Sequence, residues 1–275
     1  MIRPCAFAGF GLSWVPYHEP NNREVAVGTV DQERVQRIRS EMARAGLDAV
    51  VCRLAENVLV FSGYWPNIDY SMVVFPLEGD PVLIAPQFER DIAEEGWIAD
   101  LRTYGAWQIQ YPHPNVSLAR MLRQVAEEKK LRGKRIGYEG NFEYIAPSQL
   151  AAEPTVPMAT TRQMIHEAFG DAQYVDATTT IDAIRAVKTA RDIEKLRLVN
   201  EIAGIGLQAY KEHAEPGRRA CEVAAAVEAA IYDQGVGYKG ARFARGYAQV
   251  TGGPMTAIGW EYPRSKDRRL DVGDL

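Results

Sequence analysis

The sequence predicts a mixed-sheet α/β domain followed by a second region that is organised differently. Two observations predict the domain over residues 28–180: apolar strand-like runs alternate with amphipathic helical patterns, and two of the runs form a hairpin pattern. A third observation concerns residues 181–275, where two long helical patterns precede glycine-rich segments. We expect residues 1–27 to form a lead-in segment.

Spacing and turn residues place each element of the first domain. Apolar residues recur every three or four positions between Asp31 and Gly46, which predicts a helix that the glycine ends. The further elements are expected in this order: a buried strand at 48–52, an apolar segment ending in a glycine turn at 57–64, hairpin strands at 71–76 and 81–86, a helix at 87–95, a helix at 115–130, a strand at 135–139 and a helix at 161–169.

The pattern changes near Thr178, where long helices replace the alternation of strands and helices. Helical faces continue to His213, with an interruption at Lys188-Thr189, and Pro216-Gly217 ends the pattern. A second helix is expected at 221–234. The segment 248–254 then has the pattern of a glycine-rich strand. We therefore place a domain boundary near residue 180.

Composition excludes several classes of function. The net charge of -4 gives no basic face for binding nucleic acid, and no apolar run reaches the ~18 residues of a membrane span. The three widely spaced cysteines argue against a disulfide framework and favour a cytoplasmic protein. The four histidines are distant from one another in the sequence and form no local zinc motif, and His113 and His166 have the pattern of solvated residues.

Four segments occur in an order and spacing that carry a family resemblance. They are 184–197, with Asp192 where Glu is usual; Pro216-Gly217 with the helix after it; 57–64, which contains Ser62-Gly63-Tyr64; and Gly253-Pro254 together with 270–275. Together they resemble the pita-bread metallopeptidase superfamily, which includes Xaa-Pro aminopeptidases, prolidases and creatinases. The resemblance implies a creatinase/prolidase-type N-terminal mixed-sheet domain followed by an incomplete pita-bread domain.

The resemblance also implies where the metal chemistry lies. In that family two metal ions, held by two Asp, one His and two Glu, bind a hydroxide and polarise the scissile carbonyl. Asp274 matches a turn residue of the motif, so all five ligands are expected beyond Leu275 and the chain is interpreted as truncated. We expect no catalytic residue, metal ligand or cofactor in this fragment, and a pair of manganese, cobalt or zinc ions in a full-length parent.

Five residues are candidates for substrate binding. Trp260, in a segment where family peptidases carry His, could stack on a ring or a quaternary ammonium group, and Tyr262 lies close by. Arg242 or Arg245 could hold a substrate carboxylate in a bidentate fork. Trp65 lies in an aromatic loop that, in the family, reaches across a dimer to the partner's active site. Local packing, or a surface ion pair for the arginines, is the structural alternative in each case.

Three functions remain open. The first is a fragment of a cytoplasmic metal-dependent hydrolase, itself inactive, whose homodimeric parent cleaves small peptides before proline. The second is a creatinase-like or ectoine-hydrolase-like enzyme that hydrolyses a C–N bond in a small amide or amidine. The third is a non-catalytic binding or scaffold relative. The sequence after Leu275 would separate the third from the other two.

Overall fold

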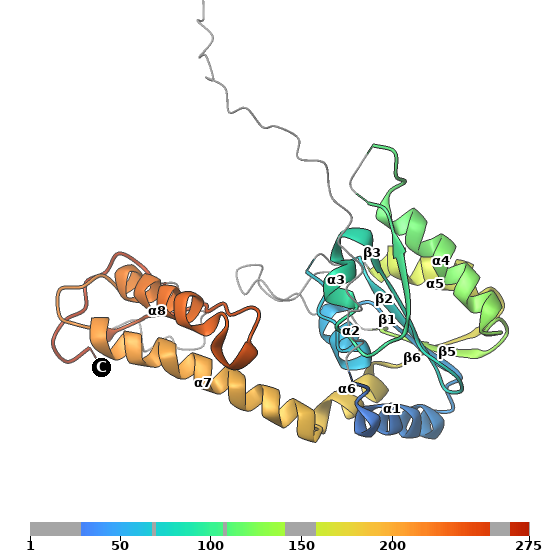
Figure 1. Cartoon of the computed structure of the whole chain (residues 1–275), viewed down its shortest axis with the longest axis horizontal. Coiled ribbons are helices and arrows are strands. Elements are labelled where there is room, and N and C mark those ends of the chain that lie inside the picture. The colour runs from blue at the N-terminus through green and yellow to red at the C-terminus, as the bar shows by residue number, and fades with distance from the viewer. Residues whose placement is uncertain (1–28, 68–69, 107–108, 141–157, 254–264, 275) are drawn as a thin grey trace, which may run out of the picture.

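A computed structural model describes residues 29–67, 70–106, 109–140, 158–253 and 265–274 of the chain. A six-stranded sheet with helices on both faces forms one part, and a long helical hairpin extends away from it (Figure 1). The predicted mixed-sheet α/β class is confirmed, and the arrangement of strands explains most of the apolar runs in the sequence.

The sheet has the strand order β4-β3-β2-β1-β5-β6. Its strands are β1 (Ala49–Cys52), β2 (Met72–Pro76), β3 (Val82–Pro86), β4 (Asp100–Tyr104), β5 (Arg135–Tyr138) and β6 (Gln173–Asp176). Strand β2 is antiparallel to both β1 and β3, while the pairs β3–β4, β1–β5 and β5–β6 are parallel. The predicted hairpin is confirmed as β2–β3, in which Val73 lies opposite Leu83.

Helices cover both faces of the sheet and create two cores. One face carries α1 (Gln32–Ala45), α2 (Ala55–Ser62), α3 (Arg90–Ala93) after a 3-10 turn at Gln87–Glu89, and α6 (Thr178–Ala186); the other carries α4 (Pro114–Glu128) and α5 (Met158–Phe169). Within β1, Val50 and Cys52 join the first core, whereas Ala49 and Val51 join the second. Burial on both faces makes the central strands continuously apolar.

The two edge strands, β4 and β6, were not predicted from the sequence. Each strand pairs on one side only, and most of its side chains are partly or fully exposed. Their sequences, Asp-Leu-Arg-Thr-Tyr and Gln-Tyr-Val-Asp, are correspondingly polar, so neither forms an apolar run. An edge position therefore removed the pattern on which the prediction of the other strands depended.

The second part of the chain is built on α7 (Ala190–His213) and α8 (Ala220–Gly235), with a 3-10 turn at Tyr238–Gly240. The two helices pack closely: a Cβ on Gly206 of α7 would lie 2.6 Å from Ile231 Cδ1 of α8. A small core forms beside them from Ala220, Val223, Ala224, Val250 and Leu270. Helix α6 packs with the sheet through Ile181 and Ile184, and the division of the chain at residue 180 stays a prediction.

The strand expected at 248–254 is wrong for the described residues 248–253. The backbone N–H of Val250 donates to Ser265 Oγ at 2.9 Å, and that of Ala248 donates to Glu228 Oε1 at 2.9 Å. These donors are therefore satisfied by side chains instead of by a neighbouring strand. Over the described part of this region, the β-type pairing is one isolated bridge between Arg219 and Arg269.

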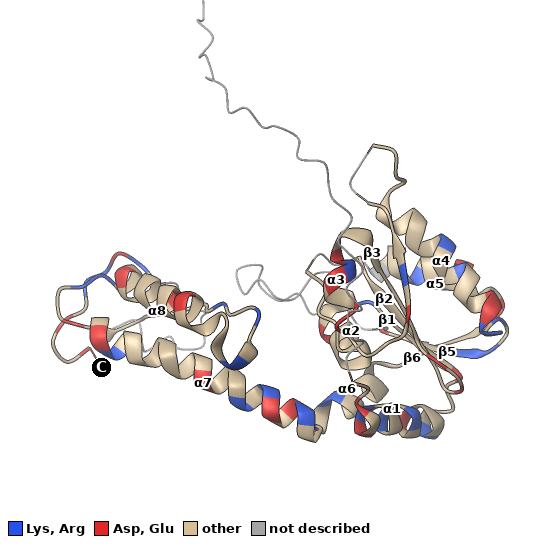
Figure 2. Ribbon diagram, viewed as in Figure 1, with Lys and Arg blue, Asp and Glu red and all other residues tan. Residues whose placement is uncertain are grey.

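Charged side chains of both signs are interspersed over the structure. Figure 2 shows acidic and basic residues alternating along α1 and along the first half of α7. Among the described residues, no helix is long and apolar enough to cross a membrane.

A buried carboxylate joins the carboxyl ends of β1 and β5 to the start of α2. Glu139, directly after β5, accepts hydrogen bonds from the backbone N–H of Arg53 at 2.7 Å, from that of Leu54 at 3.1 Å and from Asn57 Nδ2 at 2.6 Å. Leu54 is the N-cap residue of α2, so Glu139, which follows another strand, accepts the N–H of the N-cap position at the start of this helix.

The side chain of Arg53 extends the same junction to the other face. Its guanidinium donates to Thr161 Oγ1 of α5 at 3.1 Å and to Asn115 Oδ1 of α4 at 3.0 Å. Two adjacent residues, Arg53 and Leu54, thus connect strands β1 and β5 with helices α2, α4 and α5.

Because Glu139 is buried, we expect the stability of the protein to fall as the pH rises. Burial raises the pKa of Glu139 to about 7, although hydrogen bonds from Asn57, Arg53 and Leu54 lower it. The pKa of this group in the unfolded chain is near 4.3. Between about pH 4.5 and 7 the folded state therefore still holds a proton that the unfolded state has already released. The free energy of unfolding should decrease over this interval by up to about 3 kcal/mol from this group.

Urea denaturation at pH 5, 6, 7 and 8 measures this contribution. The variant Glu139→Gln should lack it, so the difference in stability between variant and wild type should change with pH. The variant Glu127→Gln, on the exposed side of α4, should keep the wild-type dependence. An unchanged pH dependence in Glu139→Gln would contradict the prediction.

Two glycine-to-alanine variants should differ in their effect on stability. A Cβ on Gly137, in the middle of β5, would lie 2.8 Å from Leu47 Cδ1 and 2.9 Å from Ala177 Cβ. Gly137→Ala should therefore destabilise the protein by about 1–3 kcal/mol through overpacking. At Gly204, an exposed position in α7, a Cβ meets nothing within 4 Å, so Gly204→Ala should leave the melting temperature unchanged or raise it. Circular dichroism melts of both variants test this contrast.

Candidate functional site

The aromatic loop between α2 and β2 is held at its first end by a buried carboxylate. Tyr64 is 1% exposed, and its hydroxyl donates to Glu89 Oε2 at 2.6 Å and lies 3.2 Å from Ser71 Oγ. The same Glu89 oxygen accepts the backbone N–H of Asn67 at 2.8 Å. Burial and the Glu89 contact raise the pKa of Tyr64 far above its usual range, so the phenol remains a hydrogen-bond donor.

The second end of the loop is held by aromatic and cationic contacts. Tyr104 at the end of β4 donates its hydroxyl to the carbonyl of Tyr70 at 2.6 Å. The guanidinium of Arg53 lies 5.6 Å from the centre of the Tyr70 ring, and the His113 ring meets that ring edge-on at 6.1 Å. Trp65 is half-buried between these two fixed ends. The described residues at both ends of the loop, Tyr64 to Asn67 and Tyr70, are thus held by contacts from the sheet and its helices.

The structure brings Arg242 to the side of the sheet where this loop begins. Arg242 forms an ion pair with Glu95, shortly after α3, and both side chains remain about half exposed. The neighbouring Trp97 donates its backbone N–H to Ser62 O at 2.8 Å, and its ring covers Gly63. Arg242 therefore lies close to the glycine turn that precedes Trp65, and the ion pair is the contact it makes here.

The other predicted binding residues are not brought to this place by the described structure. Arg245 is exposed in the segment after α8. Trp260 and Tyr262 lie outside the described residues.

Two histidines are more constrained than the sequence indicated. His113 is the N-cap of α4, where its Nδ1 accepts the backbone N–H of Asn115 at 3.2 Å. His166 stacks on the Tyr174 ring at a centroid distance of 3.8 Å, and partial burial lowers its pKa. His113 is exposed, as the sequence indicated, and also caps its helix. For His166 the interpretation as a solvated residue was wrong, because the ring is partly buried against Tyr174.

The donor set of the described residues does not suit a pair of metal ions. Over these residues, no three His, Cys, Asp or Glu side chains gather closely enough to hold a metal. Asp274 instead receives a fork from Arg268, at 2.6 and 2.9 Å, and accepts the backbone N–H of Asp271 at 2.7 Å. Arg268 lowers the pKa of Asp274, which keeps this turn carboxylate ionised.

Sequence reasoning missed Glu139, Arg53 and Glu89. The first two had a readable signal, because each is a charged residue placed directly after a buried strand, where open α/β sheets place their polar sites. Glu89 had none, since it lies in a short 3-10 turn and its role depends on Tyr64, 25 residues away in the sequence.

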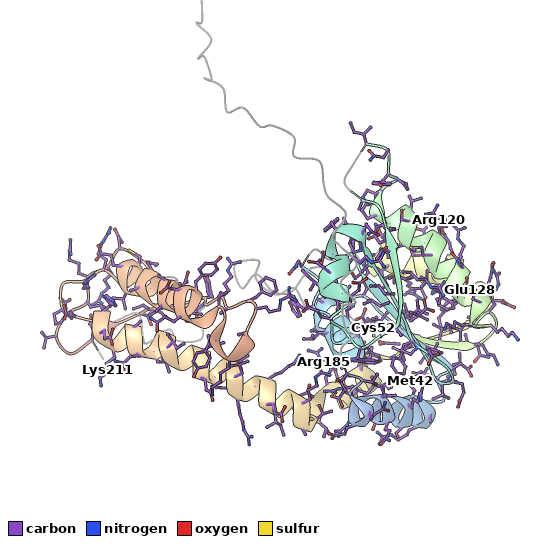
Figure 3. The ribbon with its side chains drawn as sticks, viewed as in Figure 1. Met42, Cys52, Arg120, Glu128, Arg185 and Lys211 are labelled. Atoms are coloured by element: carbon purple, nitrogen blue, oxygen red, sulfur yellow. The ribbon has the colours of Figure 1, made fainter. Side chains whose placement is uncertain are left out.

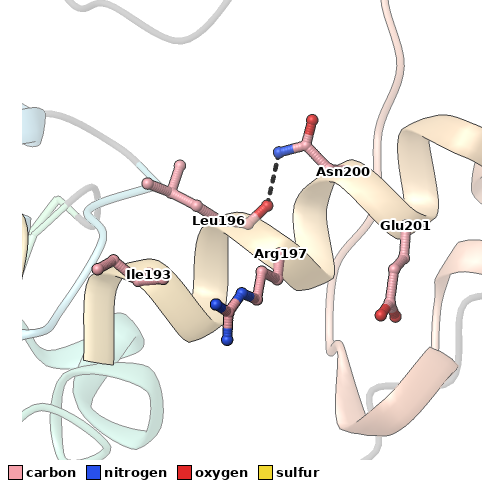
Figure 4. Close-up of a pocket in the computed structure, with 5 residues that line it drawn as sticks. All are labelled: Ile193, Leu196, Arg197, Asn200 and Glu201. Carbon is pink, nitrogen blue, oxygen red and sulfur yellow. Dashed lines mark hydrogen bonds between the residues drawn. The ribbon is translucent and has the colours of Figure 1, made fainter. Parts of the chain in front are cut away.

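A shallow hollow lies along α7, away from the sheet. Figure 4 shows its lining residues, Ile193, Leu196, Arg197, Asn200 and Glu201, on successive turns of one helix. Asn200 donates to the carbonyl of Leu196 at 2.7 Å, so its amide is used within the helix. All five side chains are exposed.

Comparisons with known proteins agree with this architecture. The uncharacterized hydrolase/peptidase y4tM of Sinorhizobium fredii is 24% identical over 257 residues, which cover 89% of this chain and 59% of that protein. The ectoine hydrolase of Halomonas elongata is 24% identical over 191 residues, 67% of this chain and 44% of that protein. The chain thus spans about half the length of these relatives.

A solved structure has the same fold. The prolidase from Pyrococcus horikoshii superposes with a TM-score of 0.61 at 20% identity, over 88% of this chain and 58% of the prolidase. Residues 34–187, more than half of the chain, match the creatinase/prolidase N-terminal domain. The chain therefore belongs to the creatinase/prolidase N-terminal domain family.

Proposed function

We propose that this chain forms the substrate-binding, N-terminal part of a metal-dependent hydrolase that cleaves the peptide bond before proline. The observation that carries the proposal is the aromatic loop around Trp65, which Glu89 and Tyr104 hold from both ends. A loop fixed in this way costs little additional ordering when it meets a ligand, which favours a binding role. The names of the prolidase and peptidase relatives support the class of substrate.

The proposal separates binding from bond cleavage. Two bridged divalent cations such as manganese, cobalt or zinc would supply a hydroxide and polarise the scissile carbonyl. The described residues do not offer the ligands for them. The 275-residue chain should accordingly show no turnover of Xaa-Pro dipeptides or tripeptides, with or without added manganese. Turnover by this chain alone would contradict the separation.

A version extended beyond Leu275 to the length of the relatives tests the activity itself. It should hydrolyse Xaa-Pro peptides when manganese is present. Trp65→Ala should raise KM by roughly tenfold and change kcat little, as expected when a contact binds the ground and transition states alike. Phe88→Ala, which removes an exposed aromatic ring elsewhere on the sheet domain, is the control and should leave both constants unchanged. An equal effect of the two substitutions would argue against a binding role for Trp65.

A second candidate function is supported by the ectoine hydrolase relative, whose identity to this chain is the same 24%. Under this proposal the substrate is a small amide or amidine whose C–N bond is hydrolysed, and Arg242 provides the fork for a substrate carboxylate. The arginine must then exchange Glu95 for substrate. A panel of small C–N substrates, measured beside the Xaa-Pro peptides with the extended protein, distinguishes the two.

A homodimer belongs to both proposals, because a loop that reaches a partner's site requires a second copy. Sedimentation analysis of the extended protein should give twice the monomer mass.

A further inference from the structure

The junction between α6 and α7 is closed by side chains from the first turn of α1. Helix α6 ends at Ala186 and α7 begins at Ala190, so only residues 187–189 connect them. Val187 is extended and 53% exposed. The three-residue connection alone therefore does not fix the direction of α7 relative to the sheet.

Arg34 joins both helix ends through one guanidinium. Its Nη1 donates to the carbonyl of Ile184, in the last turn of α6, at 3.0 Å, while its Nη2 pairs with Asp192 in the first turn of α7. The last carbonyls of a helix lack partners within it, so Arg34 satisfies one of them and also meets a carboxylate. Arg34 is only 4% exposed.

Asp192 has a second role at the same point. With Thr189 it forms the capping box of α7: its carboxylate accepts the Thr189 N–H at 2.8 Å, and the Thr189 hydroxyl accepts the Asp192 N–H at 3.3 Å. The guanidinium of Arg34 thus holds the residue that defines the start of α7.

Further bonds from the first turn of α1 reinforce this contact. Asp31 caps α1 with one oxygen and accepts the Thr189 hydroxyl with the other at 2.9 Å, and Glu33 accepts the Ala190 N–H at 3.2 Å. Helix α1 is itself fixed to the sheet by Val35, Ile38 and Met42 in the first core. We call the set Asp31, Glu33, Arg34, Thr189 and Asp192 the junction latch.

Among the described residues, the direct polar contacts between residues 29–186 and residues 190–274 fall in two places. One is the junction latch, beside which Arg191 donates to the carbonyl of Thr29 at 2.6 Å, and the other is the Arg242–Glu95 ion pair. The side chains of that pair are 49% and 41% exposed, and exposed ion pairs of this kind contribute little. The latch, built on a buried arginine, is the tie that can fix a direction.

We propose that Arg34 is the positioning residue that sets the direction of α7 relative to the sheet. Removing its guanidinium turns residues 187–189 into a hinge. Because α7 has 24 residues, it is about 36 Å long, and a tilt of about 15° at its start displaces its far end by about 9 Å. The inference is independent of the proposed hydrolase function, since it concerns the arrangement of the chain alone.

Spin-label distances between α4 and the end of α7 test the proposal on the full 275-residue chain. Arg120 and Lys211, labelled in Figure 3, are exposed on α4 and α7 and provide the positions Arg120→Cys and Lys211→Cys. Cys5→Ser and Cys221→Ser remove competing thiols, while Cys52 is buried in the sheet. With wild-type Arg34, the distance distribution should be narrow.

Arg34→Ala should widen or shift this distribution by on the order of 10 Å while circular dichroism retains the wild-type spectrum. Arg34→Lys, which keeps the charge but has no fork, should give an intermediate width. Arg44→Ala removes an exposed arginine from the last turn of the same helix and should leave the distribution narrow, as should Arg242→Ala.

Several outcomes would overturn the proposal. These are a broad wild-type distribution, an unchanged distribution in folded Arg34→Ala, or an equal widening in Arg242→Ala. If Arg34→Ala does not fold, Thr189→Val decides: widening supports the proposal, and a narrow distribution contradicts it. Thr189→Ser keeps the capping hydroxyl and should restore the narrow distribution.

Discussion

The arrangement of the sheet unit depends on one buried carboxylate, that of Glu139. The sheet unit is the six-stranded sheet with the helices on its faces, which lie within residues 29–186. Without this carboxylate, two backbone N–H groups at the end of β1 would be buried without partners at the start of α2, where the N-cap position holds Leu54. A buried donor that loses its partner costs about 1–3 kcal/mol, so replacing this acceptor affects both elements together. Helix α2 is thus held in a fixed position relative to β5, a strand from a later part of the chain.

The two principal junctions use the same chemistry in different surroundings. Glu139, an acidic residue directly after β5, accepts the backbone N–H groups that lead from β1 into α2. At the junction latch a basic side chain, Arg34, joins the end of one helix to the start of the next. The first lies at the carboxyl ends of β1 and β5 and fixes the start of α2 against them. The second lies where the chain leaves that unit, so it determines how the later helices are directed.

The elements that could be predicted from the sequence are those whose burial is uniform or one-sided. The central strands are buried on both faces and form apolar runs, while α1 and α4 are buried on one side and show helical spacing. Strands β4 and β6 escaped prediction because edge positions tolerate polar residues. Trp65 and Arg242 could be singled out by residue type, but Glu139 and Arg53 bond to residues 62 to 108 positions away. No local pattern records such contacts.

The direction of α7 also connects the two candidate binding features. Trp65 belongs to the sheet unit, whereas Arg242 belongs to the segment after α8. The half-exposed ion pair between Arg242 and Glu95 joins these two parts of the chain directly. That pair is too exposed to hold the two units in place, and a substrate carboxylate could compete for the same guanidinium. The distance between the Trp65 ring and the Arg242 guanidinium is therefore set at the start of α7, by Arg34, which contacts neither side chain. A substitution at Arg34 would consequently affect binding that needs both features, while leaving binding to the aromatic loop alone unchanged.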